Sequence, residues 1–206
     1  MFSKYIRVAV SAALLSLAAQ VHAVDGIVLI DQNRALAGNL TAGDTPGYPV
    51  SINLPGSYRL SGNLTVPSGL NGIEIAADDV TLDLNGFRVT SSGGSATGVR
   101  DMGSHARIAV SNGTISGFGT GVLMMTSKHV HAQDLRTTNL SGVSMVVGPY
   151  SLLQHNSAQG LLQVECPSVI SENVTEGFIT VVVGTSGELC VRWHNRSLNF
   201  TGDVTQ

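Results

Sequence analysis

The segment ARIAVSNGTISGFGTGV, residues 106–122, holds one full unit of the pattern that decides the fold: an alternating strand, Asn112, and the pair Gly121-Val122. The glycine–apolar pair recurs at Gly72-Ile73, Gly98-Val99, Gly121-Val122, Gly142-Val143, Gly160-Leu161 and Gly177-Phe178. After 13 or 14 residues, and after 18 in the last copy, each pair is followed by Asn85, Asn112, Asp134, Asn156, Asn173 or Asn195. A fixed period of this size is typical of solenoids, in which each repeat buries one face against its neighbours.

Alignment of the copies on these marker residues predicts which side chains point inward. The residues four before a marker are all apolar, namely Ile108, Val130, Leu152, Val169 and Val191. Those two before it are smaller or mixed, namely Val110, Ala132, Gln154, Ser171 and Trp193. Period-two alternation indicates strands with one buried face, so we expect both sets, Trp193 included, in the core. The copies are too short for crossover helices, so turns alone must join the parallel strands.

The marker residues are expected at the corners between strands. Among residues other than glycine, Asn and Asp best tolerate the left-handed backbone conformation that a sharp corner needs. Stacked in register, such side chains also hydrogen-bond from one repeat to the next. The sequence therefore predicts a corner ladder formed by Asn85, Asn112, Asp134, Asn156, Asn173 and Asn195.

The N-terminal residues 1–23 have the pattern of a secretory signal peptide. Lys4 and Arg7 precede the apolar run 8–19, and Ala23 supplies a small residue at the expected cleavage site. A membrane anchor is the alternative, but the apolar run is shorter than the roughly 20 residues of a bilayer-spanning helix. Cleavage after Ala23 predicts a secreted or periplasmic protein, and no later segment is apolar enough to span a membrane.

The processed chain would be one domain with a mildly acidic surface. It has nine Lys and Arg against fourteen Asp and Glu residues, a net charge of −5 without any basic block, which argues against a nucleic-acid partner. Residues 24–56 are broken by Gly, Pro, Asn and Asp and are expected to cap the first repeat of a domain spanning residues 57–206. Little sequence remains to cap the other end, so the last coil could pair with a second copy.

Two cysteines, Cys166 and Cys190, occur in a chain that is expected to fold in an oxidising compartment. Counted from their markers, they are offset by two residues along the strand and one strand across. This places their Cα atoms roughly 8 Å apart, slightly beyond the usual reach of a disulfide. A register shift at Pro167 would close the gap, so the sequence leaves a Cys166–Cys190 disulfide open.

Three segments resemble one known class of proteins. LPGSYRLSGNLTV (54–66), ADDVTLDLNGF (77–87) and ARIAVSNGTISGFGTGV (106–122) are similar to secreted, right-handed parallel β-helix proteins of the pectin-lyase-like class. The resemblance covers residues 49–122 well and the later repeats by period alone. It implies an all-β fold: a single-stranded right-handed parallel β-helix of about six coils with an N-terminal cap. It implies no particular activity, because the fold hosts lyases, hydrolases, epimerases and adhesins.

Enzymes of the resembled class use carboxylates, often with calcium, and a basic residue in an outer groove. The predicted outward positions include Asp83, Arg107, His129 and His131, which could together move a proton on a sugar acid. A solvated polar face is the alternative. Asp78 and Asp79 are weak candidates for calcium, against a turn with solvated carboxylates, since calcium takes six to eight oxygens. No other cofactor or metal is expected.

The catalytic motifs of the better-known enzymes in this class are missing from the sequence. We therefore expect a non-catalytic extracytoplasmic module that binds a polysaccharide or a cell-surface partner through one flat sheet. The alternative is a small polysaccharide lyase or hydrolase that uses Asp83, Arg107, His129 and His131. Self-association through an open C-terminal coil is a third hypothesis.

Overall fold

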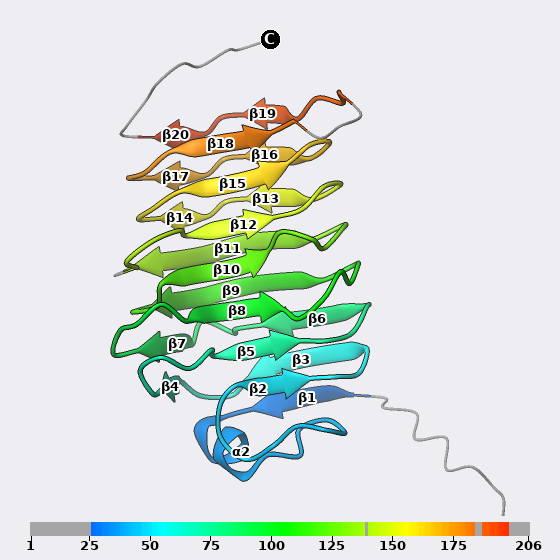
Figure 1. Ribbon diagram of the computed structural model, residues 1–206, viewed down its shortest axis with the longest axis vertical. Helices are drawn as coiled ribbons and strands as arrows, with labels where there is room; N and C mark the ends of the chain where they lie inside the picture. Colours follow the sequence, from blue (N-terminus) through cyan, green and yellow to red (C-terminus); the bar gives the residue numbers. More distant parts are fainter. Residues whose placement is uncertain (1–25, 139, 184–186, 198–206) are drawn as a thin grey trace, which may run out of the picture.

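The computed structural model describes residues 26–138, 140–183 and 187–197. Within them, twenty strands form two sheets, every recorded strand pair is parallel, and one short helix is present. The strands follow one another as stacked layers from the N-terminal to the C-terminal end (Figure 1). The prediction of an all-β fold with parallel strands is therefore confirmed. The predicted signal peptide, residues 1–23, lies outside the described residues.

The sheet of thirteen strands is called sheet A here, and the sheet of seven strands is called sheet B. The main row of sheet A consists of β1 (Ile27–Ile30), β3 (Gly56–Leu60), β6 (Val80–Asp83), β9 (Ala109–Ser116), β11 (His131–Thr138), β13 (Leu152–Gln154), β16 (Val169–Ser171) and β19 (Val191–Trp193). Its side row, which β9 and β11 join to the main row, adds β4 (Leu64–Val66), β7 (Arg88–Ser91), β14 (Ser157–Ala158), β17 (Val174–Thr175) and β20 (Arg196–Ser197). Sheet B consists of β2 (Val50–Ile52), β5 (Ile73–Ile75), β8 (Thr97–Asp101), β10 (Thr120–Met124), β12 (Met145–Val147), β15 (Leu162–Glu165) and β18 (Ile179–Val182).

The chain alternates between the two sheets throughout. After β2 it passes through sheet A, crosses to one strand of sheet B, and returns to sheet A next to the strand it left one repeat earlier. Parallel neighbours normally need a long connection, commonly a helix. Here the strand of the opposite sheet is itself the connection, which explains why repeats of about twenty residues suffice.

The core lies between the inner faces of the two sheets. In sheet A the fully buried residues Leu82, Val110, Ala132, Leu153 and Ile170 are consecutive cross-strand partners. In sheet B the equivalent row is Ile73, Val99, Val122, Met145 and Leu162. Burial of each such side chain stabilises the fold by roughly 1.5–3 kcal/mol before entropy is considered.

The predicted inward register is right for the second and third repeats and wrong for the last three. Ile108, Val110, Val130 and Ala132 are buried as expected. In the later repeats Leu153 and Ile170, predicted outward, are buried, whereas Val169, Val191 and Trp193, predicted inward, are exposed. The marker asparagines are therefore not equivalent residues along the whole chain.

The corners explain this one-residue slip. Asn85, Asn112 and Asp134 adopt positive φ angles of 52°, 59° and 53°, as predicted. In the last three repeats the left-handed residue is instead the one before the asparagine: His155, Glu172 and His194 have φ angles of 54°, 57° and 50°. The asparagine itself is thereby turned inward.

Asn156, Asn173 and Asn195 form a buried ladder inside the corner. The side-chain nitrogen of each asparagine donates to the oxygen of the next, over 2.9 Å for both pairs. The same side-chain oxygens accept the backbone N–H groups of Asn156 and Asn173, over 3.0 and 3.1 Å. The ladder predicted for six residues thus consists of three, and it satisfies backbone groups that the corner would otherwise leave unpaired.

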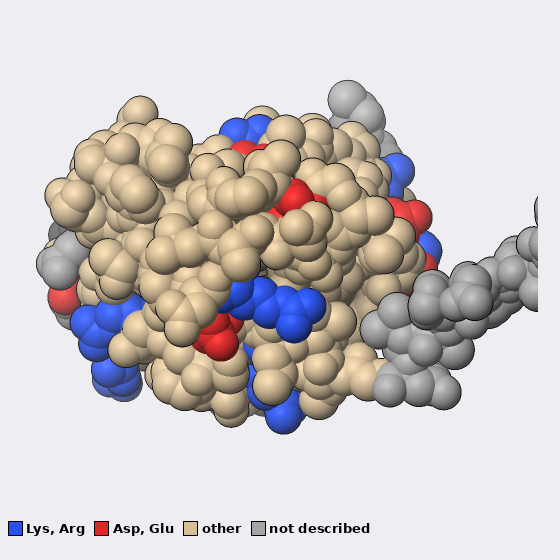
Figure 2. All heavy atoms as spheres, turned by 90° about the horizontal axis from the view of Figure 1, so that it is seen from below, with Lys and Arg blue, Asp and Glu red and all other residues tan. Residues whose placement is uncertain are grey.

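The N-terminal segment both covers the core and starts the sheets. Helix α2 (Gln32–Ala37) is capped by Asp31, whose side chain accepts from the Arg34 N–H over 2.9 Å. Buried Ala35 and Leu40 belong to the core cluster. Figure 2 views this end directly and shows Lys and Arg side chains at separate places rather than in one basic area. Because β1 and β2 pair with β3 and β5, the segment is continuous with the repeats.

At the opposite end, β18, β19 and β20 are the last described strands of their rows. The inward side chains Ile179 and Val181 are only partly buried there. In sheet A the inward position after Ile170 is Arg192, a charged residue. An inward charge discourages further strand pairing. The predicted self-association through this end stays a prediction.

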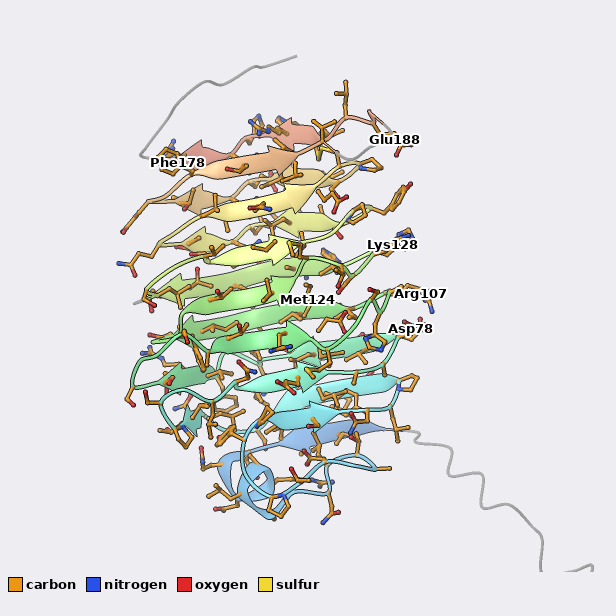
Figure 3. The ribbon with its side chains drawn as sticks, in the orientation of Figure 1. Asp78, Arg107, Met124, Lys128, Phe178 and Glu188 are labelled. Carbon is orange, nitrogen blue, oxygen red and sulfur yellow. A yellow bond between two sulfur atoms is a disulfide. The ribbon has the colours of Figure 1, made fainter. Side chains whose placement is uncertain are left out.

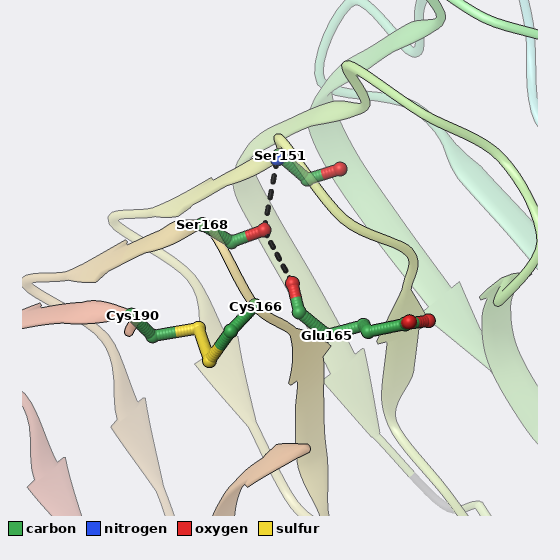
Figure 4. The surroundings of a disulfide bond; sticks show 5 residues. All are labelled: Ser151, Glu165, Cys166, Ser168 and Cys190. Atoms are coloured by element: carbon green, nitrogen blue, oxygen red, sulfur yellow. Dashed lines mark hydrogen bonds between the residues drawn. A yellow bond between two sulfur atoms is a disulfide. The ribbon is translucent and has the colours of Figure 1, made fainter. Parts of the chain in front are cut away.

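Cys166 and Cys190 form a disulfide with a Cα–Cα distance of 4.9 Å. The register is the one that gave the prediction, since Val169 pairs with Val191. The predicted separation of roughly 8 Å was wrong because it assumed a straight strand, whereas Cys166 lies before β16, in the corner that follows β15. Within the corner, the Ser168 hydroxyl donates to the Glu165 carbonyl over 2.6 Å and accepts from the Ser151 N–H over 2.9 Å (Figure 4).

Replacement of Asn173 by Ala tests the ladder. Asn173 is 0% exposed, and its side chain contacts Asn156, Asn195 and the carbonyls of Leu153 and Ser171. We expect the free energy of unfolding in urea to fall by about 2–3 kcal/mol, because buried partners lose their hydrogen bonds. Asn33→Ala, on the exposed side of α2, is the control and should change it by less than about 0.5 kcal/mol. Equal effects of the two variants would contradict the ladder's role.

Candidate functional site

The outer face of sheet A carries a straight row of polar side chains that ends in an aromatic ring. Ser111, Gln133, Gln154, Ser171 and Trp193 are consecutive cross-strand partners. Neighbouring strands are about 4.8 Å apart, so the side chains of Ser111, Gln133 and Gln154 follow one another at a regular spacing, whereas Ser171 beside Trp193 is only 6% exposed. Trp193, at its C-terminal end, is 62% exposed.

Exposed apolar and aromatic groups surround Trp193. Its ring lies 4.6 Å from the ring of His194, centroid to centroid, with the planes inclined by 49°. In the adjacent outward row, Val169 and Val191 are cross-strand partners and are both exposed. Trp193, which the sequence placed in the core, therefore lies on the surface, beside the exposed side chains of Val169, Val191 and His194.

A row of ionisable side chains follows the corner beside this strip. The Glu172 carboxylate accepts from the Gln154 amide over 3.1 Å and lies 2.5 Å from His155 Nε2. The hydrogen bond from Gln154 lowers the pKa of Glu172 below its usual range. Electrostatic interactions with His155 and His194, and a hydrogen bond with His155, lower this pKa further. Glu172 is therefore ionised at neutral pH and oriented by its neighbours.

We call this region the Trp193 surface. It comprises Gln154, His155, Val169, Glu172, Val191, Trp193 and His194. An exposed aromatic plane with fixed amide and carboxylate groups at its side can stack on an apolar ring face and bond the groups at that ring's edge. All seven residues come from the last three repeats, in which the corner is shifted by one residue. Because this shift turns Val169, Val191 and Trp193 outward, it creates the surface.

The four predicted catalytic residues do not form one patch. Asp83 faces outward from β6, where its carboxylate accepts from Arg59 Nε over 2.9 Å and from the Asn112 amide over 3.2 Å. His131 faces outward two strands away, between Ala109 and Leu152, and its Nε2 is buried without a hydrogen-bond partner in the described part of the chain. Strand geometry separates Asp83 from His131 by roughly 12 Å.

Arg107 and His129 instead lie at the corner before the strands. Arg107 binds Asp79 through two contacts, Nε–Oδ1 at 2.5 Å and Nη2–Oδ2 at 2.8 Å, and Asp78 at 3.6 Å. Figure 3 shows Asp78 and Arg107 on one edge of the stack, with Lys128 above them. The hydrogen bond from Arg107 lowers the pKa of Asp79. His129 packs against Tyr150, ring centroids 5.4 Å apart.

These contacts also bear on the calcium candidates. Both carboxylate oxygens of Asp79 are bound to Arg107, and Asp78 accepts the Ala106 N–H over 2.8 Å. The single guanidinium balances one of the two negative charges, and two carboxylates provide fewer oxygens than the six to eight that calcium takes. Asp78 and Asp79 are therefore an ion-paired corner in the structure, closer to the alternative of a polar turn.

A buried carboxylate lies at the end of β8. Asp101 occupies the inward row of sheet B, and its side chain is 1% exposed. It accepts from the Ser127 hydroxyl over 2.8 Å, from the backbone N–H groups of Gly103 and His105, and from His105 Nδ1. Only the i, i+4 spacing of Asp101 and His105 hinted at this contact, since Ser127 comes from the next repeat.

The hydrogen bonds decide the charge of Asp101. Burial alone would raise its pKa, but the bonds from His105, Ser127 and the backbone outweigh burial and lower the pKa below its ordinary value. An ionised carboxylate bonded to Nδ1 leaves Nε2 of His105 as the basic nitrogen. The side chain of His105 is 28% exposed.

Neither relatives nor a metal centre assigns a role to these groups. Comparison of the chain with protein-family profiles, with curated proteins and with solved structures finds no match. The described ranges contain no group of three or more His, Cys, Asp or Glu side chains placed to hold a metal ion. Among the same residues, no helix has the length and apolar character needed to cross a bilayer.

The pH dependence of stability tests the Asp101 cluster. Because the folded-state pKa of Asp101 is lowered, its contribution is present above the unfolded-state pKa of about 3.9 and is lost as pH falls through the lower folded value. We expect Asp101→Asn to reduce the free energy of unfolding at pH 7 by about 3 kcal/mol. The variant should also lose less further stability than the parent between about pH 4 and pH 2.

Asp134→Asn, at an exposed corner, is the matched control for urea unfolding at each pH. We expect it to change stability at pH 7 by less than about 0.5 kcal/mol. Identical pH profiles of the parent and Asp101→Asn proteins would show that Asp101 contributes nothing through its charge.

Proposed function

We propose that the protein is a secreted or periplasmic, right-handed parallel β-helix module that binds a polysaccharide through the Trp193 surface without chemically changing it. The alternation of the chain between two parallel sheets supports the β-helix. The N-terminal pattern of residues 1–23 supports export. The observation that carries the binding function is the 62% exposed Trp193 on a flat sheet face, next to oriented polar groups.

A sugar ring has an apolar face and an edge of hydroxyl groups, and the Trp193 surface offers a partner for each. The indole and the exposed Val169 and Val191 side chains suit the face of the ring. The Gln154 amide and the ionised Glu172 carboxylate suit its hydroxyl groups. The regular row of Ser111, Gln133 and Gln154 continues the polar contacts along the sheet, which fits a ligand with repeating units.

A second candidate function, a polysaccharide lyase or hydrolase, is favoured by the Asp101–His105 contact. A histidine oriented through Nδ1 by an ionised, buried carboxylate is a common form of general base. On this hypothesis His105 takes the role that the sequence suggested for His129 and His131. The Ser127 hydroxyl bonds Asp101 and not His105, so the three residues are no nucleophilic triad.

Trp193→Ala tests the binding function directly. We expect retention on an immobilised polysaccharide panel to fall at least about fivefold, because a stacking contact worth about 1 kcal/mol is lost. Tyr150→Ala removes another exposed aromatic ring, at the other corner, and should leave retention unchanged. Because Trp193 is exposed, thermal unfolding should not change. Unaltered retention of the Trp193 variant on every polysaccharide bound by the parent would refute the proposed surface.

Turnover measurements separate the two candidate functions. Release of reducing or unsaturated sugar ends from the same panel is expected to be absent for a binding module. If turnover is found, His105→Ala should lower kcat by about 10²–10⁴, the usual contribution of a general base. His131→Ala is the control. His131 lies on the outer face of sheet A, in β11, whereas His105 follows β8 of sheet B, and His131 Nε2 makes no hydrogen bond to any described residue. Loss of turnover in His131→Ala alone would restore the role suggested by the sequence.

A further inference from the structure

A hollow of about 320 Å³ opens where the ends of β7 and β9 meet the loop 92–96, away from the Trp193 surface. Its lining residues are small or hydroxyl-bearing with one exception, the aromatic Phe118. They are Thr90, Ser91, Ser92, Gly93, Gly94, Ser116, Gly117, Phe118 and Ser141. The volume lies at the small end of the range of about 300–1,000 Å³ found for small-molecule sites.

Glycine backbone keeps this space open. Gly93, Gly94 and Gly117 have positive φ angles of 128°, 110° and 78°, which other residues rarely adopt. A Cβ atom on Gly117 would lie 1.9 Å from the Ser91 carbonyl oxygen, so the two segments can approach only because this side chain is absent. The loop 92–96 thus borders the hollow with glycine backbone, and Gly93 and Gly94 have no side chains that could fill the space.

Several hydroxyl groups in the lining have no partner within the described residues. Thr90 and Ser91 donate to the carbonyls of Leu64 and Gly93, over 3.2 and 3.3 Å. The hydroxyls of Ser92, Ser116 and Ser141 make no hydrogen bond to any described residue. Ser92 and Ser141 are exposed, and Ser116, although only 6% exposed as a residue, is not among the described residues with a buried, unpaired side-chain atom. All three hydroxyls are therefore accessible from the hollow and can bond water or a ligand there.

The lining defines the chemistry of the ligand. Among the described residues, no charged side chain lines the hollow, so none of them would compensate the charge of a sugar acid or an amino sugar. Hydroxyl groups both donate and accept, which matches the hydroxyls of a neutral sugar. Phe118 supplies one apolar contact. We propose that this hollow binds a single neutral sugar unit, an inference that rests on the proposed polysaccharide-binding function and extends it to a second subsite.

The test is titration of the isotope-labelled protein with neutral monosaccharides, followed by NMR. Glucose, galactose, mannose and N-acetylglucosamine serve as probes, and galacturonate and glucosamine as charged counterparts. We expect at least one neutral probe to shift the backbone signals of Gly94, Ser116 and Gly117, and the charged counterparts to bind more weakly. Stronger binding of the charged sugars, or no shift in these signals with any probe, would overturn the proposal.

Variants of the lining supply the second measurement. Ser116→Ala and Ser141→Ala should each weaken binding about fivefold, the usual effect of one lost neutral hydrogen bond. Ser92→Trp, which adds a large side chain at an exposed position, should abolish binding without disturbing the buried Ser116. Ser157→Ala, at an exposed position of β14, is the control and should bind like the parent. Parent-like binding by Ser92→Trp and by both alanine variants would overturn the proposal.

The two sites can fail separately. Trp193→Ala should leave the monosaccharide shifts at Gly94 and Ser116 unchanged, since the hollow lies on β7 and β9 and Trp193 on β19. If these signals do not respond while polysaccharide retention still depends on Trp193, the hollow is not a sugar site and the proposed function stands. If monosaccharides bind in the hollow but no polysaccharide is retained, the Trp193 surface is refuted instead.

Discussion

The backbone register between successive repeats is the constraint on which the rest of the structure depends. Each strand of sheet A pairs with the strand one repeat earlier, and the left-handed residue at each corner fixes where that pairing restarts. Because side chains alternate between the two faces of a strand, a slip of one residue would exchange core and surface. The fully buried rows through Val110 and Val122 show that the register is held from one repeat to the next.

The same constraint produces both the interior ladder and the exposed Trp193 surface. When His155, Glu172 and His194 take the left-handed corner positions, the following asparagines turn inward and bond to one another. The strands before them are shifted with the corner, so Leu153 and Ile170 fill the core while Val169, Val191 and Trp193 face outward. The surface proposed to bind sugar is thus a consequence of how the last corners are built.

The sequence predicted the parallel sheets, the short turns and the left-handed corners at Asn85, Asn112 and Asp134, because period and residue type carry that information. It could not predict the slip, because an asparagine suits both a left-handed corner and an inward ladder position. Of the apolar residues that follow the repeated glycines, Val99 and Val122 lie in the inward row of sheet B, but Met145, Leu162 and Ile179 take the places of Val143, Leu161 and Phe178. Nothing in the sequence indicated that Ser127 joins Asp101 and His105, because Ser127 comes from the next repeat and meets Asp101 only in the folded protein.

The junction between β11 and β13 offers the most direct test, because the two registers differ there. Cross-strand NMR contacts between backbone protons of Ala132 and residues 152–154 would identify the true partner. The structure pairs Ala132 with Leu153, and we expect contacts between these two residues. Contacts of Ala132 with Gln154 instead would show that the asparagine markers align without a slip, which would return Trp193 to the core and contradict the proposed surface.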